Sequence, residues 1–473
     1  MWLLTTTALN QIWLLATLPL LARFYSPREF GIYAVFQTSH VLASTFAGLR
    51  YESAAVVPKT DRTALACLAL TMLAGFATAL VILGATLVAS MLGLPSFAEN
   101  GLMFFGVSLA IAAFVGSFQR SAVAWATRKS RFNAIAIMSS AINVLTILLQ
   151  LLAAHIVGPK ASSLIGGFVV SLSVVTILAV LRMALTAAGT GIKLPLRRRI
   201  FAAARRYKRF PTYMLVYGLT TALRERLVQL LIAVYAGAAL VGEFAMASRF
   251  AAAPNSLVYS ALGPVIFSHA ARSSSRSTLS VVKMMFEMML VILVPVFAIF
   301  SSEAYSIVGQ LLGARWLGVA RIAVILAPAM LALTSTSWMD RIFDVYSRQR
   351  LVLWMQIAYT TVLCISMTAA MATDRQVAAL YCFSVISTLY FALFGSVAMK
   401  IVGAKEWSAF RPLMASLLAY AVLFAFSRLV QGQLSLALRC VVYLTIYSIW
   451  LAVYFFGMKK IKYIRNILSG AIE

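Results

Sequence analysis

The chain has 473 residues, of which 62% are hydrophobic and 11% are charged, whereas an ordinary soluble domain is roughly half apolar and about a quarter charged. At ~20 residues per membrane-spanning helix, the apolar residues are enough for about 14 spans. This composition excludes a soluble globular enzyme, a disordered protein and a disulfide-stabilised scaffold. The net charge of +27 would indicate nucleic-acid binding in a soluble protein. In a chain this apolar, the positions of the basic residues must first be compared with the ends of the predicted membrane spans.

Long apolar runs separated by short polar breaks predict fourteen spans. Only helices and closed barrels satisfy the backbone in lipid, and the runs are continuous rather than alternating, so we expect helices. In the first break, Ser26, Pro27 and Glu29 are typical of a capped helix N-terminus. The predicted spans are 3–21, 30–57, 63–92, 101–125, 133–157, 161–184, 210–236, 240–266, 281–302, 318–338, 351–372, 375–399, 410–430 and 437–457.

The basic residues are distributed unequally between the two sides of this arrangement. When a residue in the first or last few positions of a span is counted with the adjoining break, 27 of the 40 lysines and arginines lie in the even-numbered breaks and the C-terminal tail, eight lie in the odd-numbered breaks, and five lie inside spans. Because Lys and Arg concentrate on the cytoplasmic side of membrane proteins, both termini are predicted to be cytoplasmic. The same bias explains the net charge without nucleic acid.

The longest break, 185–209, separates six predicted spans from eight and is strongly basic. Ile200, Phe201, Ala204 and Tyr207 share one helical face within it. This face fits a basic amphipathic helix on anionic lipid, but a linker that only fixes topology fits as well. The predicted domains are a six-helix bundle at 1–184, a basic cytoplasmic linker at 185–209, a second six-helix bundle at 210–400, and two further helices with a basic tail at 401–473.

The chain contains an internal repeat. Residues 20–25 and 30–34 are similar to residues 231–235 and 241–245, at an offset of 210 to 211 positions. Both copies end an outward-going span and begin an inward-going one, so the two halves are expected to be related by an axis along the membrane normal. The predicted fold is therefore an all-α polytopic membrane protein with two six-helix bundles around a central cavity and two C-terminal helices.

Several kinds of chemistry are missing from the sequence. It has no Gly-Lys dipeptide for a phosphate-binding loop of the ATPase kind, no His-Glu-x-x-His zinc motif and no Asp-x-Asp pair. The three histidines, His40, His155 and His269, are far apart in the sequence. We therefore expect no enzyme activity, no metal and no cofactor.

Charged residues lie inside the predicted spans. An arginine at the centre of a membrane helix costs about 2.5–3.5 kcal/mol, so five on lipid-facing surfaces would cost on the order of 12–17 kcal/mol. We expect them to face protein or water, either as a hydrated cationic cavity for an anionic headgroup or as ion pairs such as Arg50 with Glu52. Arg224 and Arg226 point about 200° apart on a helix, so only one should face the centre. The predicted substrate-binding residues are Arg50, Glu52, Gln119, Arg120, Arg224, Arg226 and Arg249.

Six segments in order along the chain resemble the polysaccharide flippases of the Wzx type, the oligosaccharide-transporter branch of the MATE/MOP superfamily that includes the multidrug and toxin extruders. One of them, LLARFYSPREFGIYAVFQT, is similar to the first hairpin of that family. Another, LRYESAAVVPKTD, is similar to the end of the family's second helix. The seventh span departs from the family pattern at Arg224-Glu225-Arg226. The six segments lie at 20–38, 49–61, 118–137, 205–214, 241–254 and 347–357.

The resemblance implies a flippase that moves an undecaprenyl-diphosphate-linked oligosaccharide across the bacterial inner membrane for assembly of O-antigen, capsule or exopolysaccharide. The implied partners are this lipid-linked substrate with its anionic diphosphate, membrane lipids, a glycan polymerase and other assembly proteins. Three alternatives stay open: a multidrug cation exporter of the same fold, a peptidoglycan-precursor flippase, and a membrane glycan polymerase or ligase. An exporter of cations should have an acidic or aromatic cavity, and a polymerase should have long external loops.

Overall fold

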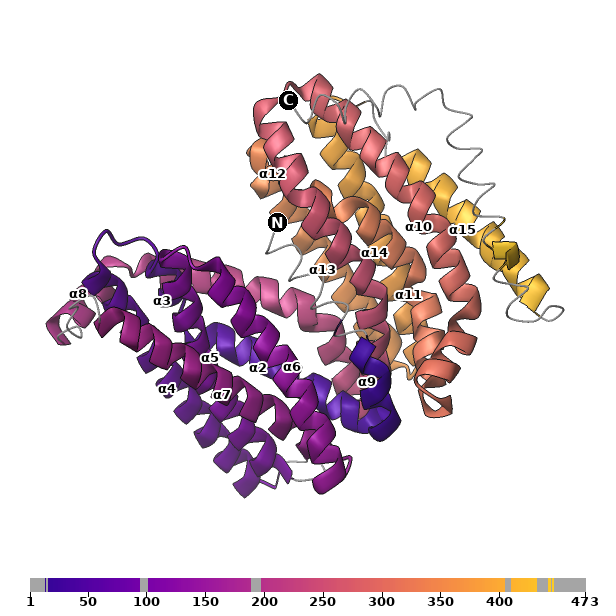
Figure 1. Ribbon diagram of the computed structural model, residues 1–473. Coiled ribbons are helices and arrows are strands. Elements are labelled where there is room, and N and C mark those ends of the chain that lie inside the picture. Colours follow the sequence, from indigo (N-terminus) through magenta and orange to yellow (C-terminus); the bar gives the residue numbers. More distant parts are fainter. Residues whose placement is uncertain are drawn as a thin grey trace. The chain divides into compact units, whose positions relative to one another are not determined.

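The computed structural model describes residues 13, 16–93, 101–188, 197–404, 410–431, 441–443 and 445. These residues form helices and turns, with no strand among them, which confirms the predicted all-α membrane protein (Figure 1). Within this part of the chain, nine helical segments are long and apolar enough to cross a membrane. The count of fourteen spans stays a prediction, and most of the predicted spans 3–21 and 437–457 lies outside the described residues.

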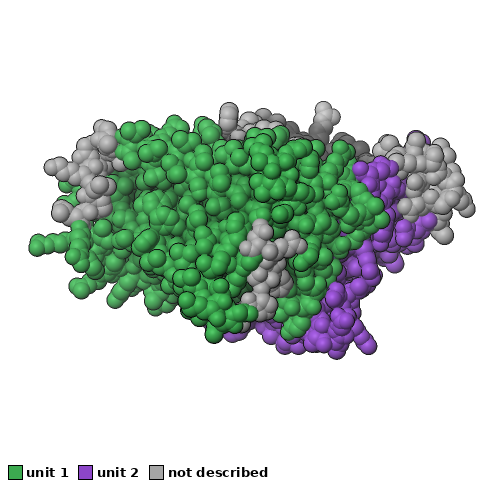
Figure 2. All heavy atoms as spheres, turned by 90° about the horizontal axis from the view of Figure 1, so that it is seen from below, with its two compact units in different colours: residues 1–246, 311–318 green, residues 247–310, 319–473 purple. Residues whose placement is uncertain are grey.

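The chain divides into two compact units, which Figure 2 shows in different colours. Unit 1 comprises residues 1–246 and 311–318, and unit 2 comprises residues 247–310 and 319–473. The predicted domain bounds at 184, 209 and 400 stay a prediction. The helices are α2 (Pro27–Ala47), α3 (Tyr51–Ala54), α4 (Asp61–Met91), α5 (Gly101–Arg128), α6 (Phe132–Ile156), α7 (Ala161–Ala188), α8 (Arg197–Arg206), α9 (Leu215–Arg272), α10 (Ser275–Leu311), α11 (Leu317–Thr336), α12 (Asp340–Val345), α13 (Gln349–Ala372), α14 (Gln376–Ile401) and α15 (Phe410–Gln431).

Helix α2 begins as the sequence predicts. Ser26 is the N-cap, Pro27 is the first helical residue, and the Glu29 carboxylate accepts a hydrogen bond from the Ser26 backbone N–H at 2.7 Å. Ser26 Oγ accepts in return from the Glu29 N–H, which completes a capping box. Within unit 1, α2 packs against α4, α5 and α7.

The predicted second span, 30–57, is not one continuous helix. Helix α2 ends at Ala47, Leu49 and Arg50 adopt left-handed backbone conformations with φ of 46° and 60°, and the short α3 follows. Non-glycine residues pay roughly 1–2 kcal/mol for this conformation. Surrounding contacts must offset that cost, and the side chains of this segment supply them.

Helix α9 contains most of the predicted seventh span and all of the predicted eighth span. Its backbone leaves the helical conformation at Gly237, where φ is 80° and ψ is 174°, which is a region that favours glycine. This break separates the predicted seventh and eighth spans, 210–236 and 240–266, at the position that the sequence indicates.

The two repeat copies contact each other reciprocally within unit 1. A methyl group on Gly31 would overlap the carbonyl oxygen of Ala238, and one on Gly242 would overlap the carbonyl oxygen of Pro27. The offset is 211 residues in both cases, so equivalent positions of the two copies exchange roles. Small residues let helix backbones approach closely in membranes, and here they join the repeats around a local two-fold axis.

Helix α8 is the described part of the predicted basic linker. Ala203 is buried, and Ile200 and Tyr207 pack against a cluster that contains Cys67 of α4 and Trp125 of α5. Phe201, predicted to lie on the same apolar face, is instead exposed. The reason is the register of the helix, because Ile200, Ala203 and Tyr207 are three and four residues apart and form one narrow stripe.

Unit 2 is held together by two apolar clusters. In one, Phe286 of α10, Phe343 of α12 and Met399 of α14 are almost completely buried. In the other, Val294 of α10 and Leu331 of α11 contact Tyr420 of α15. The Tyr420 hydroxyl donates to Ser301 Oγ at 2.9 Å, which satisfies a polar group in this apolar setting.

Candidate functional site

Unit 1 contains a charged cluster where α2, α3 and α5 meet. Glu52 of α3 is only 8% exposed. Arg120 of α5 lies 3.6 Å from Glu52 Oε1 through Nη1 and donates from Nη2 to Ser44 Oγ of α2 at 2.9 Å. Glu52 therefore pairs with an arginine 68 residues further along the chain, and Gln119, the half-buried neighbour of Arg120, lies beside this pair in sequence.

The left-handed turn before α3 directs Arg50 toward α9. The guanidinium of Arg50 lies against Gly218 of α9, so that a methyl group added to Gly218 would overlap the guanidinium. The Nε of Arg50 is buried and has no hydrogen-bond partner among the described residues. The positive charge of Arg50 also acts on Arg120, whereas the ion pair of Glu52 is formed with Arg120.

The first half of α9 adds a second arginine-bearing surface. Thr38 of α2 donates to Gln229 Oε1 of α9 at 2.9 Å, which fixes the face of α9 that contacts α2. Arg226 precedes Gln229 by three residues and shares that face. Arg224 lies about 200° from Arg226 around the helix. Of these two arginines, Arg226 is therefore the one directed toward the polar side of α2.

Three buried charged atoms of this region have no hydrogen-bond partner among the described residues: Arg50 Nε, Arg226 Nε and Glu52 Oε2. A buried polar group left unsatisfied costs about 1–3 kcal/mol, and more when it is charged. Oxyanions accept hydrogen bonds from guanidinium N–H groups, whereas a hydroxyl group donates to a carboxylate oxygen. The arrangement suits a ligand with an anionic group next to hydroxyl groups.

Sequence reasoning missed the contribution of α2 to this cluster. His40 is far from the other histidines in the sequence, but its Nδ1 is buried without a described partner and its ring meets Phe168 edge-on, with 5.3 Å between the ring centres. The available signal was the spacing of His40 and Ser44. They are four residues apart in an otherwise apolar span, which places both on one helix face.

Arg249 lies in the part of α9 that belongs to unit 2. Unit 2 has its own polar cluster, in which the Tyr259 hydroxyl donates to Asp340 Oδ2 at 2.7 Å and accepts from Arg341 Nη2 at 2.9 Å. The sequence did not single out this cluster, because its members are 81 residues apart. In the described part of the chain, no group of three or more His, Cys, Asp or Glu side chains is arranged to hold a metal ion.

Residues 20–321 match the family model described as polysaccharide biosynthesis protein, which covers well over half of the chain. The chain belongs to this family. The predicted resemblance to polysaccharide flippases is thereby confirmed at the level of the family. No curated protein sequence matches the chain.

Solved structures show which fold this family member adopts. A structure of the lipid II flippase MurJ in an inward closed conformation aligns with a TM-score of 0.68 at 13% identity, covering 97% of this chain and 99% of that chain. An inward-facing multidrug resistance MATE family transporter of the MOP superfamily aligns with a TM-score of 0.59 at 11% identity, covering 88% of this chain and 94% of that chain. The chain therefore has the fold of these two membrane proteins, and its long apolar helices make it a multi-pass membrane protein.

Proposed function

We propose that this protein is a flippase that moves an undecaprenyl-diphosphate-linked oligosaccharide repeat unit from the cytoplasmic to the periplasmic leaflet of a bacterial inner membrane. The product supplies assembly of a surface polysaccharide such as O-antigen, capsule or exopolysaccharide. The protein makes and breaks no covalent bond, so it is not an enzyme. Both termini lie in the cytoplasm.

The observation that carries this proposal is the buried cationic cluster of unit 1. Arg120 is paired with the Glu52 carboxylate, and Arg50 and Arg226 each keep a buried Nε without a described hydrogen-bond partner. A diphosphate supplies oxygen acceptors, and the planar guanidinium can bind them bidentately. Sugar hydroxyl groups supply donors for Glu52 Oε2. The isoprenoid tail of the substrate needs no polar contact and stays in the bilayer.

One alternative is favoured by a specific observation. The fold resembles that of MurJ, a lipid II flippase, and a peptidoglycan precursor has the same anionic linkage as an oligosaccharide repeat unit. Membership in the polysaccharide biosynthesis family favours the repeat unit. A multidrug cation exporter fits less well, because an arginine cluster repels cations. A glycan polymerase or ligase fits less well too, because the family and the structural relatives are transporters or flippases.

Deletion of the gene, followed by extraction of lipid-linked intermediates, distinguishes these functions. We expect loss of a surface polysaccharide and accumulation of complete, unpolymerised repeat units on the undecaprenyl carrier. Accumulation of the peptidoglycan precursor instead would support the alternative flippase. Incomplete units, or units already polymerised, would place the protein at another step and overturn the proposal.

A further inference from the structure

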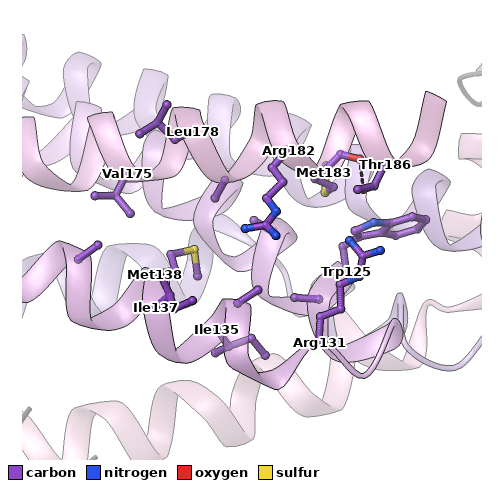
Figure 3. A pocket seen from close by; sticks show the side chains of 15 residues that line it. Trp125, Arg131, Ile135, Ile137, Met138, Val175, Leu178, Arg182, Met183 and Thr186 are labelled. Carbon is purple, nitrogen blue, oxygen red and sulfur yellow. Dashed lines mark hydrogen bonds between the residues drawn. The ribbon is translucent and has the colours of Figure 1, made fainter. Parts of the chain in front are cut away.

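A groove opens on the surface of unit 1 between α5, α6 and α7 (Figure 3). It encloses about 910 Å³ of empty space, part of which is open to the surroundings. Its walls are mostly apolar, and Arg131, Arg182 and Trp125 line one end. The apolar part of the lining includes Ile137, Met138, Val175, Leu178 and Ala179.

The two arginines approach the groove from different elements. Arg131 is the N-cap residue of α6, and Arg182 lies near the C-terminal end of α7. Figure 3 shows both side chains extending into the space between the helices, and the one hydrogen bond drawn joins the Thr186 hydroxyl to the Met183 carbonyl. Neither guanidinium forms an ion pair or hydrogen bond with another described residue. Their charges are therefore available to a ligand.

Other basic residues close to the groove are already paired. Arg128 Nε lies 2.8 Å from Asp61 Oδ1, and Lys129 Nζ lies 2.7 Å from Asp61 Oδ2. The ammonium group of Lys129 also lies 5.1 Å from the centre of the Trp125 ring. Asp61 thus pairs with both basic residues at the end of α5, whereas no carboxylate of the described residues pairs with Arg131 or Arg182.

The groove has an apolar part and a cationic end, as expected of a site at the boundary between lipid chains and headgroups. Met138 and Val175 form its buried floor, while Ile137 and Leu178 are exposed at its rim on helices long and apolar enough to cross a membrane. Both arginines belong to breaks that the charge distribution assigns to the cytoplasmic side. Trp125 lies at the charged end, where an indole is favourable because one part is apolar and the other polar. The apolar end therefore faces lipid chains and the cationic end faces headgroups.

A second groove on the same three helices provides an internal comparison. It encloses about 970 Å³ and is lined by residues near the opposite helix ends, including Phe104, Leu152 and Ala153, with no charged residue among them. The two grooves share a mostly apolar lining. The arginine pair is what distinguishes the first.

We propose that the groove between α5, α6 and α7 binds an anionic phospholipid, with its phosphate between Arg131 and Arg182 and one acyl chain along the apolar floor. Basic pockets between membrane helices on the cytoplasmic side suit anionic headgroups. Two guanidinium groups present several N–H donors to the oxygens of one phosphate, and their positive charge attracts its negative charge. Two cations facing each other also repel when the groove is empty, so a bound anion stabilises this end of unit 1.

The test uses the purified full-length protein, titrated with phosphatidylglycerol or phosphatidylcholine of the same chain length and followed by native mass spectrometry. We expect phosphatidylglycerol to bind and Arg131→Gln/Arg182→Gln to weaken it about thirtyfold, since each basic residue contributes about 1 kcal/mol and 1.4 kcal/mol is a factor of ten. The control, Arg272→Gln/Arg276→Gln, removes two exposed charges from unit 2 on the same predicted side. It should change binding little.

A steric pair of variants tests the acyl-chain position without altering charge. Ala179→Trp fills the groove that contains the arginines and should weaken phosphatidylglycerol binding, whereas Ala153→Trp fills the uncharged groove and should not. Equal effects of the two arginine pairs, equal binding of the two lipids, or tighter binding of undecaprenyl phosphate than of phosphatidylglycerol would each overturn the proposal. The arginine variants keep the test valid if a tryptophan variant misfolds, because neither arginine contacts a described partner.

Discussion

Replacing Glu52 by glutamine should destabilise the protein strongly, because it removes the counter-charge of a buried arginine. Arg120 Nη1 lies 3.6 Å from Glu52 Oε1, and the two side chains are 25% and 10% exposed. At an effective dielectric constant of about 20, two unit charges at that distance attract by about 5 kcal/mol before desolvation. Removing one member of a buried pair typically costs about 3–5 kcal/mol. We expect Glu52→Gln to lose stability in that range.

An exposed pair of the same length is the matched control. Arg341 Nη1 lies 3.6 Å from Asp344 Oδ2, but these side chains are 39% and 45% exposed. Exposed ion pairs contribute about 0–1 kcal/mol, so Asp344→Asn should change stability little. The two substitutions remove the same charge at the same separation and differ in burial.

The assay is thermal unfolding of both variants in one detergent, with Glu52→Gln/Arg120→Met added as a double variant. The double variant should be more stable than Glu52→Gln alone, with a coupling energy of about 1–3 kcal/mol, because no uncompensated charge remains at Arg120. If Glu52→Gln and Asp344→Asn lower the melting temperature equally, or if the double variant is the least stable, the ion-pair reasoning is wrong.

Three further predictions concern the substrate site, the repeat contact and the topology. Arg226→Gln should impair surface polysaccharide export at matched protein levels, with Arg226→Lys partly active in complementation of the deletion strain; full activity of Arg226→Gln would contradict its role. Gly31→Val should lower the melting temperature, because its side chain would overlap the backbone of α9, whereas Gly166→Val meets open space and should not; equal shifts would refute the close contact. Reporters fused within 185–209 and after Pro159 should report opposite sides of the membrane, and the same side for both would refute the topology.

The positions of the helices could be predicted well from the sequence, because membrane spans depend on local composition. The capping box at Ser26 and Glu29 and the break between the seventh and eighth spans at Gly237 follow from short motifs. The end of α2 could not be predicted in the same way. Leu49 and Arg50 adopt left-handed conformations that their own residue types disfavour, and only contacts with distant segments stabilise them.

The pairing of charges depends on those distant contacts. The sequence suggested Arg50 with Glu52 because they are close in the chain, but the Glu52 carboxylate lies near Arg120 of α5 instead. The internal repeat was visible in the sequence, whereas the reciprocal contact of Gly31 and Gly242 was not. Similarity shows that two segments are equivalent but does not show that they touch.

The most direct test of the central claim is translocation by the purified protein in vesicles that contain an undecaprenyl-diphosphate-linked oligosaccharide in both leaflets. A membrane-impermeant glycosidase added outside should digest substrate from both leaflets when the protein is present. In protein-free vesicles it should digest only the substrate of the outer leaflet. Digestion confined to the outer leaflet in vesicles with correctly folded protein would contradict the proposal that this chain flips lipid-linked oligosaccharides.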